Sequence, residues 1–204
     1  MTKILQLNTS IFGDVGQSTM LASEMVESLR KQDPGARVTI RDFAREPVPH
    51  LTGDGFAAFM ATERTPEQQK LLDYSDVLIA ELRDADLIVL GLPMYNFGVP
   101  SQLKAWFDHV ARAGVTFRYT SNGSVGLLTG KKVIVLATRG GRYAGSPLDT
   151  QTQYVRDFFA FLGMRDVDFI YVEGLARSGE ARSDAIAYAR TVIHELARGT
   201  RAAA

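Results

Sequence analysis

The hydrophobic positions along this chain form two alternating patterns. Leu87–Leu92 and Val133–Ala137 are unbroken apolar runs, which are typical of strands buried on both faces of a parallel sheet. Between such runs, apolar residues recur at helical spacing, which predicts helices that pack one face against the sheet. The predicted strands cover 3–8, 37–43, 87–92, 133–137 and 167–172, and the predicted helices cover 17–31, 55–60, 65–84, 101–113, 154–164 and 183–197.

This alternation predicts an α/β fold with a doubly wound, five-stranded parallel sheet. Right-handed crossovers favour the strand order 2-1-3-4-5, which is flavodoxin-like and places a ligand at the switch point between the first and third strands. Residues 115–128 carry alternating polarity on both sides of Ser121–Ser124, a strong turn signal, so we expect a β-hairpin insertion there. With no internal repeat or linker in the sequence, residues 1–204 are predicted to form a single domain.

Composition narrows the possible functions. The chain has 23 Lys and Arg against 23 Asp and Glu, and this zero net charge gives no indication of nucleic-acid binding. The absence of cysteine excludes disulfides, thiolate metal sites and a cysteine nucleophile, and we expect no bound metal. No apolar run reaches the roughly 18 residues that a membrane-spanning helix needs. We therefore expect no membrane segment and a reducing, cytoplasmic location.

The loop that follows the third strand is the most informative stretch. Pro93–Pro100 lies at the carboxyl end of a buried strand, where open α/β sheets bind their ligands, and its prolines restrict the backbone. Its residues Met94, Tyr95, Asn96 and Phe97 suit a flat, largely apolar ring with polar edges. The alternative is a connection whose aromatic residues fill the core. Asn96 argues against it, because an amide packed between two aromatic rings needs hydrogen-bond partners.

A second loop leads from the first strand into the first helix. Ser10 and the segment Gly16–Ser18 offer hydroxyl groups and free N–H groups at a helix N-terminus, which together form an anion site without a basic side chain. A monophosphate fits such a site, whereas the glycine motifs of dinucleotide and triphosphate sites are absent from the sequence. The alternative is an ordinary helix cap at Gln17 or Ser18.

The third loop, after the fourth strand, is rich in glycine. Gly140 and Gly141 let the backbone approach a ligand closely, and Arg139 beside them could help to stabilise negative charge on a ring. The alternative is a flexible surface loop. The three loops thus combine a phosphate site, an aromatic surface for a ring and groups that stabilise negative charge, all around one switch point. This combination fits FMN better than another common ligand.

Three stretches carry a resemblance to a known family. Pro93–Phe97, Ala111–Thr120 and Thr138–Gly141 look like the FMN-dependent NADH:azoreductases, which are also NAD(P)H:quinone reductases of flavodoxin-like fold. The resemblance extends from Lys3 to about Ala197. It implies FMN-binding residues in all three loops: Ser10, Gly16, Gln17 and Ser18 at the phosphate, Pro93, Met94, Tyr95, Asn96 and Phe97 at the ring, and Thr138, Arg139, Gly140 and Gly141 at its N1/O2 side. The family often has serine at the position of Gly16, so this chain lacks one hydroxyl donor.

The resemblance also implies an activity. One tightly bound FMN per subunit would accept a hydride from NADH or NADPH and pass two electrons to a quinone or azo compound in a ping-pong reaction, without a catalytic side chain. Tyr119, Phe161 and Tyr143 would line the substrate pocket. Because the active site of this family forms between two subunits, the resemblance implies a homodimer. The sequence leaves the choice between NADH and NADPH open.

A flavodoxin-type electron carrier without its own substrate is the alternative function. Such carriers tend to be acidic for docking on basic partners, so the zero net charge and the hairpin insertion favour the enzyme. We interpret His109 and His194, both in predicted helices, as packing or surface residues, and Trp106 as a packing or subunit-contact residue. The role of His50 stays open.

Overall fold

The main sheet is parallel and lies between two layers of helices. In the computed structural model, which describes residues 1–176 and 179–200, five parallel strands are ordered β2-β1-β3-β6-β7. This order confirms the flavodoxin-like fold predicted from the sequence. The strands are β1 (Lys3–Asn8), β2 (Arg37–Asp42), β3 (Leu87–Pro93), β6 (Lys132–Thr138) and β7 (Asp166–Val172).

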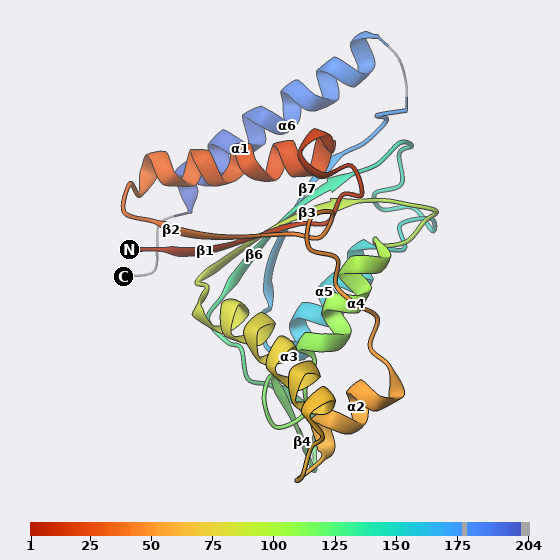
Figure 1. The fold of residues 1–204 in the computed structure, drawn as a ribbon. Coiled ribbons are helices and arrows are strands. Elements are labelled where there is room, and N and C mark those ends of the chain that lie inside the picture. Colours follow the sequence, from red (N-terminus) through yellow and green to blue (C-terminus); the bar gives the residue numbers. More distant parts are fainter. Residues whose placement is uncertain (177–178, 201–204) are drawn as a thin grey trace.

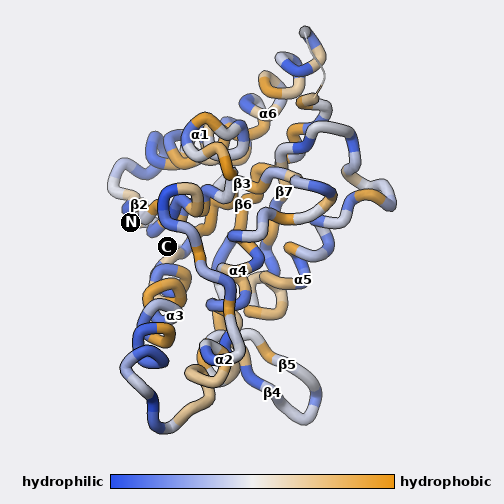
Figure 2. Tube along the Cα trace, turned by 45° about the vertical axis from the view of Figure 1, so that its right-hand side comes forward, coloured by the Kyte–Doolittle hydropathy of each residue, from blue (hydrophilic) through white to orange (hydrophobic). Residues whose placement is uncertain are grey.

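Two hydrophobic cores occupy the two faces of this sheet. Helices α1 (Gln17–Gln32) and α6 (Glu180–Gly199) cover one face, and α3 (Pro66–Asp84), α4 (Ser101–Val110) and α5 (Thr152–Leu162) cover the other (Figure 1). Successive residues of β3 alternate between the cores, because side chains of a strand point to opposite faces. Figure 2 shows hydrophobic and hydrophilic residues alternating along α3, as expected of a helix that buries one face.

Helix α3 begins where the sequence predicts. The Thr65 hydroxyl accepts a hydrogen bond from the Gln68 N–H, the Gln68 side chain accepts one from the Thr65 N–H, and Pro66 occupies the first helical position. This capping box satisfies N–H groups that would otherwise lack partners at the start of the helix. The short helix α2 (Gly53–Met60) precedes it and begins two residues before the predicted range.

Helix α4 ends three residues earlier than the predicted range of 101–113. The Thr116 hydroxyl donates to the Val110 carbonyl at 2.6 Å and accepts from the Arg112 N–H at 3.0 Å, so a side chain takes over the role of the next helical turn. Ser101 is the first helical residue, and no side-chain cap precedes it. Side chain-to-backbone bonds of this kind compete with helix propagation.

The predicted hairpin is present as a separate two-stranded antiparallel sheet, with arms shorter than expected. Strands β4 (Phe117–Thr120) and β5 (Gly123–Gly126) pair with each other and lie beside the end of α5. A Cβ atom at Gly126 would lie 2.1 Å from the Gly163 amide nitrogen, so only glycine permits this approach. The hairpin is therefore packed onto the domain and does not extend the main sheet.

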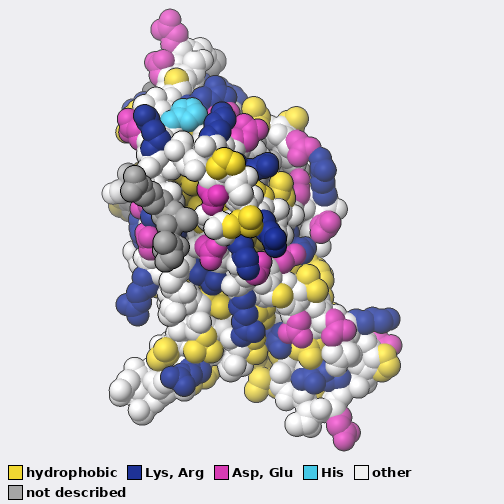
Figure 3. Space-filling view, turned by 90° about the vertical axis from the view of Figure 1, so that its left-hand side faces the viewer, with side chains coloured by type: hydrophobic (Ala, Val, Ile, Leu, Met, Phe, Trp, Pro, Cys, Tyr) yellow, Lys and Arg dark blue, Asp and Glu magenta, His cyan; other side chains and the backbone are white. Residues whose placement is uncertain are grey.

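Figure 3 shows the face at the amino ends of the strands, where positive and negative side chains are interspersed over the body of the molecule. Two projections extend from its lower end, the hairpin on one side and the α2–α3 region on the other, and hydrophobic side chains lie between them. Within the described ranges, no helix combines the length and the apolar character needed to cross a membrane.

Candidate functional site

The three loops singled out in the sequence meet at the carboxyl ends of β1, β3 and β6. The Tyr95 hydroxyl lies 3.2 Å from the Ser10 hydroxyl and accepts a hydrogen bond from the Ile11 N–H at 3.3 Å. The Thr150 hydroxyl donates to the Phe97 carbonyl, which links the loop after β3 to the loop after β6. The fold thus brings the predicted loops together at the switch point of the sheet.

At the N-terminus of α1, several polar groups have no partner among the described residues. Its N-cap is Gly16, and neither Gln17 nor Ser18 caps the helix, so an ordinary side-chain cap is not what the structure has. The Ser18 hydroxyl is buried, and among the described residues it has no hydrogen-bond partner. Within the same described part, the N–H groups of Gln17, Ser18 and Thr19 also have no acceptor. An anion at this helix end would satisfy these donors and interact favourably with the helix dipole.

Gly16 and Ser10 share one space beside this helix end. A Cβ atom at Gly16 would lie 2.2 Å from the Ser10 Oγ atom, which is too close for any side chain to fit without displacing Ser10. The Ser10 hydroxyl also accepts a hydrogen bond from the Phe12 N–H at 3.2 Å. The Ser10 side chain therefore occupies the space that a side chain at residue 16 would need, which explains the glycine at this position.

The loop after β3 contains a tight turn in an uncommon conformation. Tyr95 and Gly98 exchange two backbone hydrogen bonds, and the two residues between them, Asn96 and Phe97, have φ angles of 50° and 62°. Asparagine tolerates this left-handed region, whereas for phenylalanine it costs about 1–2 kcal/mol. Strain of this kind is concentrated at functional loops. Asn96 is exposed to solvent, so its presence reflects the turn conformation and not a buried amide that needs partners.

Gln151 holds this turn in place. Its side chain is fully buried, and its Nε2 atom donates to the Pro93 carbonyl at 3.0 Å and to the Gly98 carbonyl at 2.9 Å. The Met94 N–H donates to the Thr138 carbonyl at 3.0 Å and adds a third attachment. Gln151 carries no local signal of this role, because nothing in the residues around it marks a glutamine that bonds to a loop 58 positions away.

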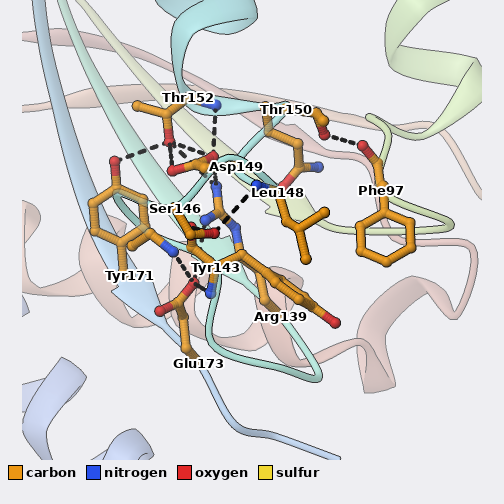
Figure 4. A network of polar contacts seen from close by, with 12 residues as sticks. Phe97, Arg139, Tyr143, Ser146, Leu148, Asp149, Thr150, Thr152, Tyr171 and Glu173 are labelled. Carbon is orange, nitrogen blue, oxygen red and sulfur yellow. Dashed lines mark hydrogen bonds and ion pairs between the residues drawn. The ribbon is translucent and has the colours of Figure 1, made fainter.

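Arg139 does not present its charge to the loops. Its side chain is completely buried and forms ion pairs with Asp149 at 2.7 Å and with Glu173 at 3.2 Å (Figure 4). The guanidinium group also lies over the Tyr171 ring, 5.1 Å from its centroid. The expectation that Arg139 would stabilise negative charge on a ligand is corrected by this geometry, because two carboxylates already neutralise it.

The charge on Asp149 follows from the same network. Burial raises the pKa of the Asp149 carboxyl, but hydrogen bonds from Arg139 and Thr152 outweigh burial and hold this pKa below its ordinary value. The carboxylate is therefore ionised at neutral pH, and the buried guanidinium keeps a charged partner.

Gly140 and Gly141 leave their N–H groups available. Their carbonyl groups accept hydrogen bonds from the N–H groups of Ala176, at 3.1 Å, and Gly174, at 2.9 Å. Among the residues for which the structure gives positions, no acceptor is bonded to the N–H group of either glycine. These two donors, and not the Arg139 side chain, are what the glycine pair offers to negative charge.

Tyr119 and Phe161 lie away from the three loops. Tyr119 is 76% exposed on the hairpin, and its ring contacts Phe117, whose ring centroid lies 4.3 Å from that of Phe161 at the far end of α5. Helix α5 starts beside the loops and spans 11 residues, or about 15 Å. The structure of one chain therefore does not place these two predicted pocket residues beside the other predicted site residues.

The remaining candidates belong to the core or the surface. His109 is buried, its Nε2 atom lies 3.0 Å from the Pro49 carbonyl, and its ring packs edge-on against Tyr74. Burial lowers the pKa of His109 below its ordinary value, which keeps the ring neutral. Trp106 is fully buried, as the packing interpretation predicts, and His50 is exposed.

Comparisons with known proteins agree with this arrangement. Residues 2–196 match the family described as having a flavodoxin-like fold. An FMN-dependent NADH:quinone oxidoreductase from Cellvibrio japonicus is 56% identical over 177 residues, which cover 86% of this chain and 89% of that protein. FMN-dependent NADH:quinone oxidoreductase 6 from Burkholderia lata is 52% identical over 195 residues, which cover 95% of this chain and 98% of that protein.

Solved structures show the same similarity. An azoreductase from Bacillus anthracis superimposes with a TM-score of 0.90 at 25% sequence identity, covering 98% of this chain and 100% of that one. An FMN-dependent NADH-azoreductase from Bacillus anthracis, solved in complex with FMN, gives a TM-score of 0.89 at 26% identity, with 98% and 99% coverage. These findings confirm the resemblance seen in the sequence. The chain belongs to the flavodoxin-like family that contains the FMN-dependent NADH:quinone oxidoreductases.

Proposed function

We propose that this protein is an FMN-dependent oxidoreductase that uses NADH to reduce quinones and azo compounds. The observation that carries the proposal is the unpartnered, buried Ser18 hydroxyl at the N-terminus of α1, beside N–H groups that also have no acceptor within the described residues. An unsatisfied buried donor costs about 1–3 kcal/mol, and a bound phosphate would remove that cost. The names of the similar proteins assign FMN and NADH to those proteins, which agrees with this reading.

The residues of the three loops fit FMN in the following way. The phosphate would bind at the N-terminus of α1, the aromatic ring system would lie on the turn after β3, and the polar edge of the ring would face the end of β6. The proposed contacts are Ser10, Gly16, Gln17 and Ser18 for the phosphate, Pro93, Met94, Tyr95, Asn96 and Phe97 for the ring, and Thr138, Gly140 and Gly141 for its polar edge. Arg139 would support the last loop from inside the protein.

When bound, FMN accepts a hydride from NADH and passes two electrons to the acceptor. The protein's own contribution is position and electrostatics. The N–H groups of Gly140 and Gly141 would stabilise negative charge at the ring edge, as the donors of an oxyanion hole do. Gln151 and Thr150 would keep the strained turn at Asn96 and Phe97 in the conformation that binds the ring. One site used in turn by NADH and the acceptor predicts ping-pong kinetics.

We also propose that the protein works as a homodimer with the active site at the interface. Several large apolar side chains are exposed on the two lower projections, including Phe56 and Met60 on α2 and Tyr119 and Val125 on the hairpin. A second subunit would cover this surface and would bring its own Tyr119 and Phe161 to the loops, which they do not reach within one chain. A monomeric mass in sedimentation at micromolar concentration, together with full activity, would exclude this arrangement.

A direct experiment separates the enzyme from an electron carrier. Purified protein is loaded with FMN, desalted and mixed with NADH and a benzoquinone in the absence of any partner protein. The enzyme retains FMN and oxidises NADH at a rate that depends on the quinone, whereas a carrier retains FMN and is inactive. NADPH in place of NADH tests the nicotinamide preference. That residues 1–204 form one domain and that the protein is cytoplasmic also stay predictions, which limited proteolysis and cell fractionation would test.

A further inference from the structure

The Tyr143 ring lies against the glycine wall, which is the pair Gly140 and Gly141 in the loop after β6. A Cβ atom at Gly141 would lie 2.5 Å from the Cζ and hydroxyl oxygen atoms of Tyr143, so the ring lies directly against that glycine. The Tyr143 ring also meets the Phe97 ring edge-on, with 5.5 Å between the centroids and 64° between the planes. The ring therefore stands between the glycine pair and the strained turn, two of the three proposed flavin contacts.

Glu173 fixes the backbone that carries this ring. Its Oε1 atom accepts hydrogen bonds from the N–H groups of Tyr143 and Ala144, both at 2.8 Å, and from the Arg139 side chain at 3.2 Å (Figure 4). The Tyr143 carbonyl in turn accepts hydrogen bonds from the N–H group of Ser146 at 2.9 Å and from its hydroxyl at 2.8 Å. Both backbone polar groups of Tyr143 are thus bound, which restricts where its ring can lie.

Arg139 and Asp149 connect this carboxylate to the rest of the fold. Arg139 follows β6, Glu173 follows β7, and Asp149 precedes α5, where it accepts a hydrogen bond from the Thr152 N–H at 3.1 Å. The fully buried guanidinium joins the two carboxylates. Three elements of the main fold therefore hold the backbone of this loop, while the ring itself is held by its contacts with Gly141 and Phe97.

We propose that Tyr143 is a specificity-determining residue for the electron acceptor and that Glu173 is its positioning residue. The proposal rests on the proposed function, because it assigns a wall to the acceptor side of that same site. An aromatic ring at this position narrows the acceptor side of the proposed site, so a compact, flat acceptor should fit better than a bulky one. The geometry points to single-ring quinones as the favoured substrate class, with large polycyclic azo dyes disfavoured.

The kinetic experiment compares two acceptors in each FMN-loaded variant. The ratio of kcat/KM for a bis-naphthyl azo dye to kcat/KM for a single-ring benzoquinone is measured for wild type, Tyr143→Ala and Tyr143→Phe. Tyr143→Ala should raise this ratio about tenfold or more, because one apolar group in a pocket discriminates by about that factor. Tyr143→Phe keeps the ring and should keep the ratio. The matched control is Tyr188→Ala, which removes a tyrosine that is 68% exposed on α6, on the other face of the sheet.

Glu173 is tested with a pair of variants. Glu173→Gln keeps an oxygen that accepts from the Tyr143 and Ala144 N–H groups, whereas Glu173→Leu removes it. Glu173→Leu should therefore shift the substrate ratio towards that of Tyr143→Ala, mostly through KM for the dye, and Glu173→Gln should restore most of the wild-type ratio. Hydrogen exchange on the FMN-free proteins gives a readout that needs no activity: the amides of Tyr143 and Ala144 should exchange faster in Glu173→Leu than in Glu173→Gln.

The outcomes are distinguishable. A wild-type protein that neither retains FMN nor oxidises NADH contradicts the proposed function, while the exchange experiment still reports on Glu173. An active wild type whose substrate ratio is the same in Tyr143→Ala overturns the assignment of Tyr143. If Tyr143→Ala keeps the substrate ratio but has a higher FMN dissociation constant, measured by flavin fluorescence, the assignment of Tyr143 to the acceptor is also overturned. The ring would then be assigned to the cofactor. Equal exchange rates in the two Glu173 variants would overturn the positioning role.

Discussion

Gln151→Leu should loosen the turn that we propose to bind the flavin and destabilise the protein at the same time. The leucine side chain fills a similar volume but cannot donate to the Pro93 and Gly98 carbonyls, which the buried amide now reaches at 3.0 and 2.9 Å. Leaving the buried Pro93 carbonyl without this partner costs about 1–3 kcal/mol, whereas the Gly98 carbonyl is only partly buried and keeps the hydrogen bond from the Tyr95 N–H. Leucine also removes the Gln151 Oε1 atom, which is buried and has no partner among the described residues, and this offsets part of the cost. We therefore expect the free energy of unfolding to fall by about 1–2 kcal/mol.

The same variant should weaken FMN binding. Phe97 and Asn96 adopt left-handed conformations that together cost up to about 2 kcal/mol, most of it at Phe97, and Gln151 is one of the groups that hold them there. Once released, the turn should relax, and FMN binding would have to restore it. An extra cost of about 2 kcal/mol corresponds to an FMN dissociation constant about 30-fold higher.

The assay uses two measurements on FMN-free protein. Urea unfolding is followed by the fluorescence of Trp106, the single tryptophan, which is buried in the core. FMN affinity is measured by the quenching of flavin fluorescence. The control is Gln153→Leu, because Gln153 lies two residues further on, is exposed, and bonds only to Asp157 among the described residues. If the two leucine variants unfolded at the same urea concentration and bound FMN equally, our account of the turn would be wrong.

Three further predictions follow from the same structure. Ser18→Ala removes a buried hydroxyl that has no partner among the described residues, so the FMN-free variant should be as stable as wild type or more stable. Its FMN affinity should be about tenfold lower. Riboflavin, which lacks the phosphate, should bind equally to both proteins in fluorescence titrations. Gly91→Ala should lower the free energy of unfolding by about 1–3 kcal/mol, because the new Cβ would lie 2.9 Å from the Ser18 carbonyl; Gly53→Ala, which meets nothing within 4 Å, is the control in urea unfolding. Burial lowers the pKa of His109 from its ordinary value of 6.5, so the stabilisation from keeping this ring neutral is complete above pH 6.5 and is lost as the pH falls below that value towards the lowered pKa. Melting temperatures at pH 7.5 and 5.5 should therefore fall less in His109→Gln than in wild type, and an equal fall would contradict this assignment.

Local patterns in the sequence were sufficient to predict the sheet and the meeting of the three loops at one edge of it. Unbroken apolar runs such as that of β3 occur where both faces of a strand are buried, and this requirement is visible in the residues themselves. The capping box at Thr65 and the turn at Ser121–Asn122 are equally local, because their partners lie within a few residues. Loops at the carboxyl ends of such strands must then meet at the switch point, whatever their side chains do.

The roles of individual side chains needed the tertiary structure. Arg139 looked like a donor for ligand charge, but Glu173, 34 positions away, and Asp149 enclose it. The sequence around Gln151 does not indicate its bond to a loop 58 positions earlier. The sequence around Tyr143 does not indicate its contacts with Gly141 and Phe97.

The sequence by itself therefore determined the fold, the family and the three loops that we propose to bind FMN, because hydrophobic periodicity and turn chemistry act between near neighbours. Only the tertiary structure decided which charges are neutralised, which turn is strained and which ring stands beside the glycine wall. These properties depend on distances between atoms that the chain brings together from separate strands, and a linear pattern does not contain those distances.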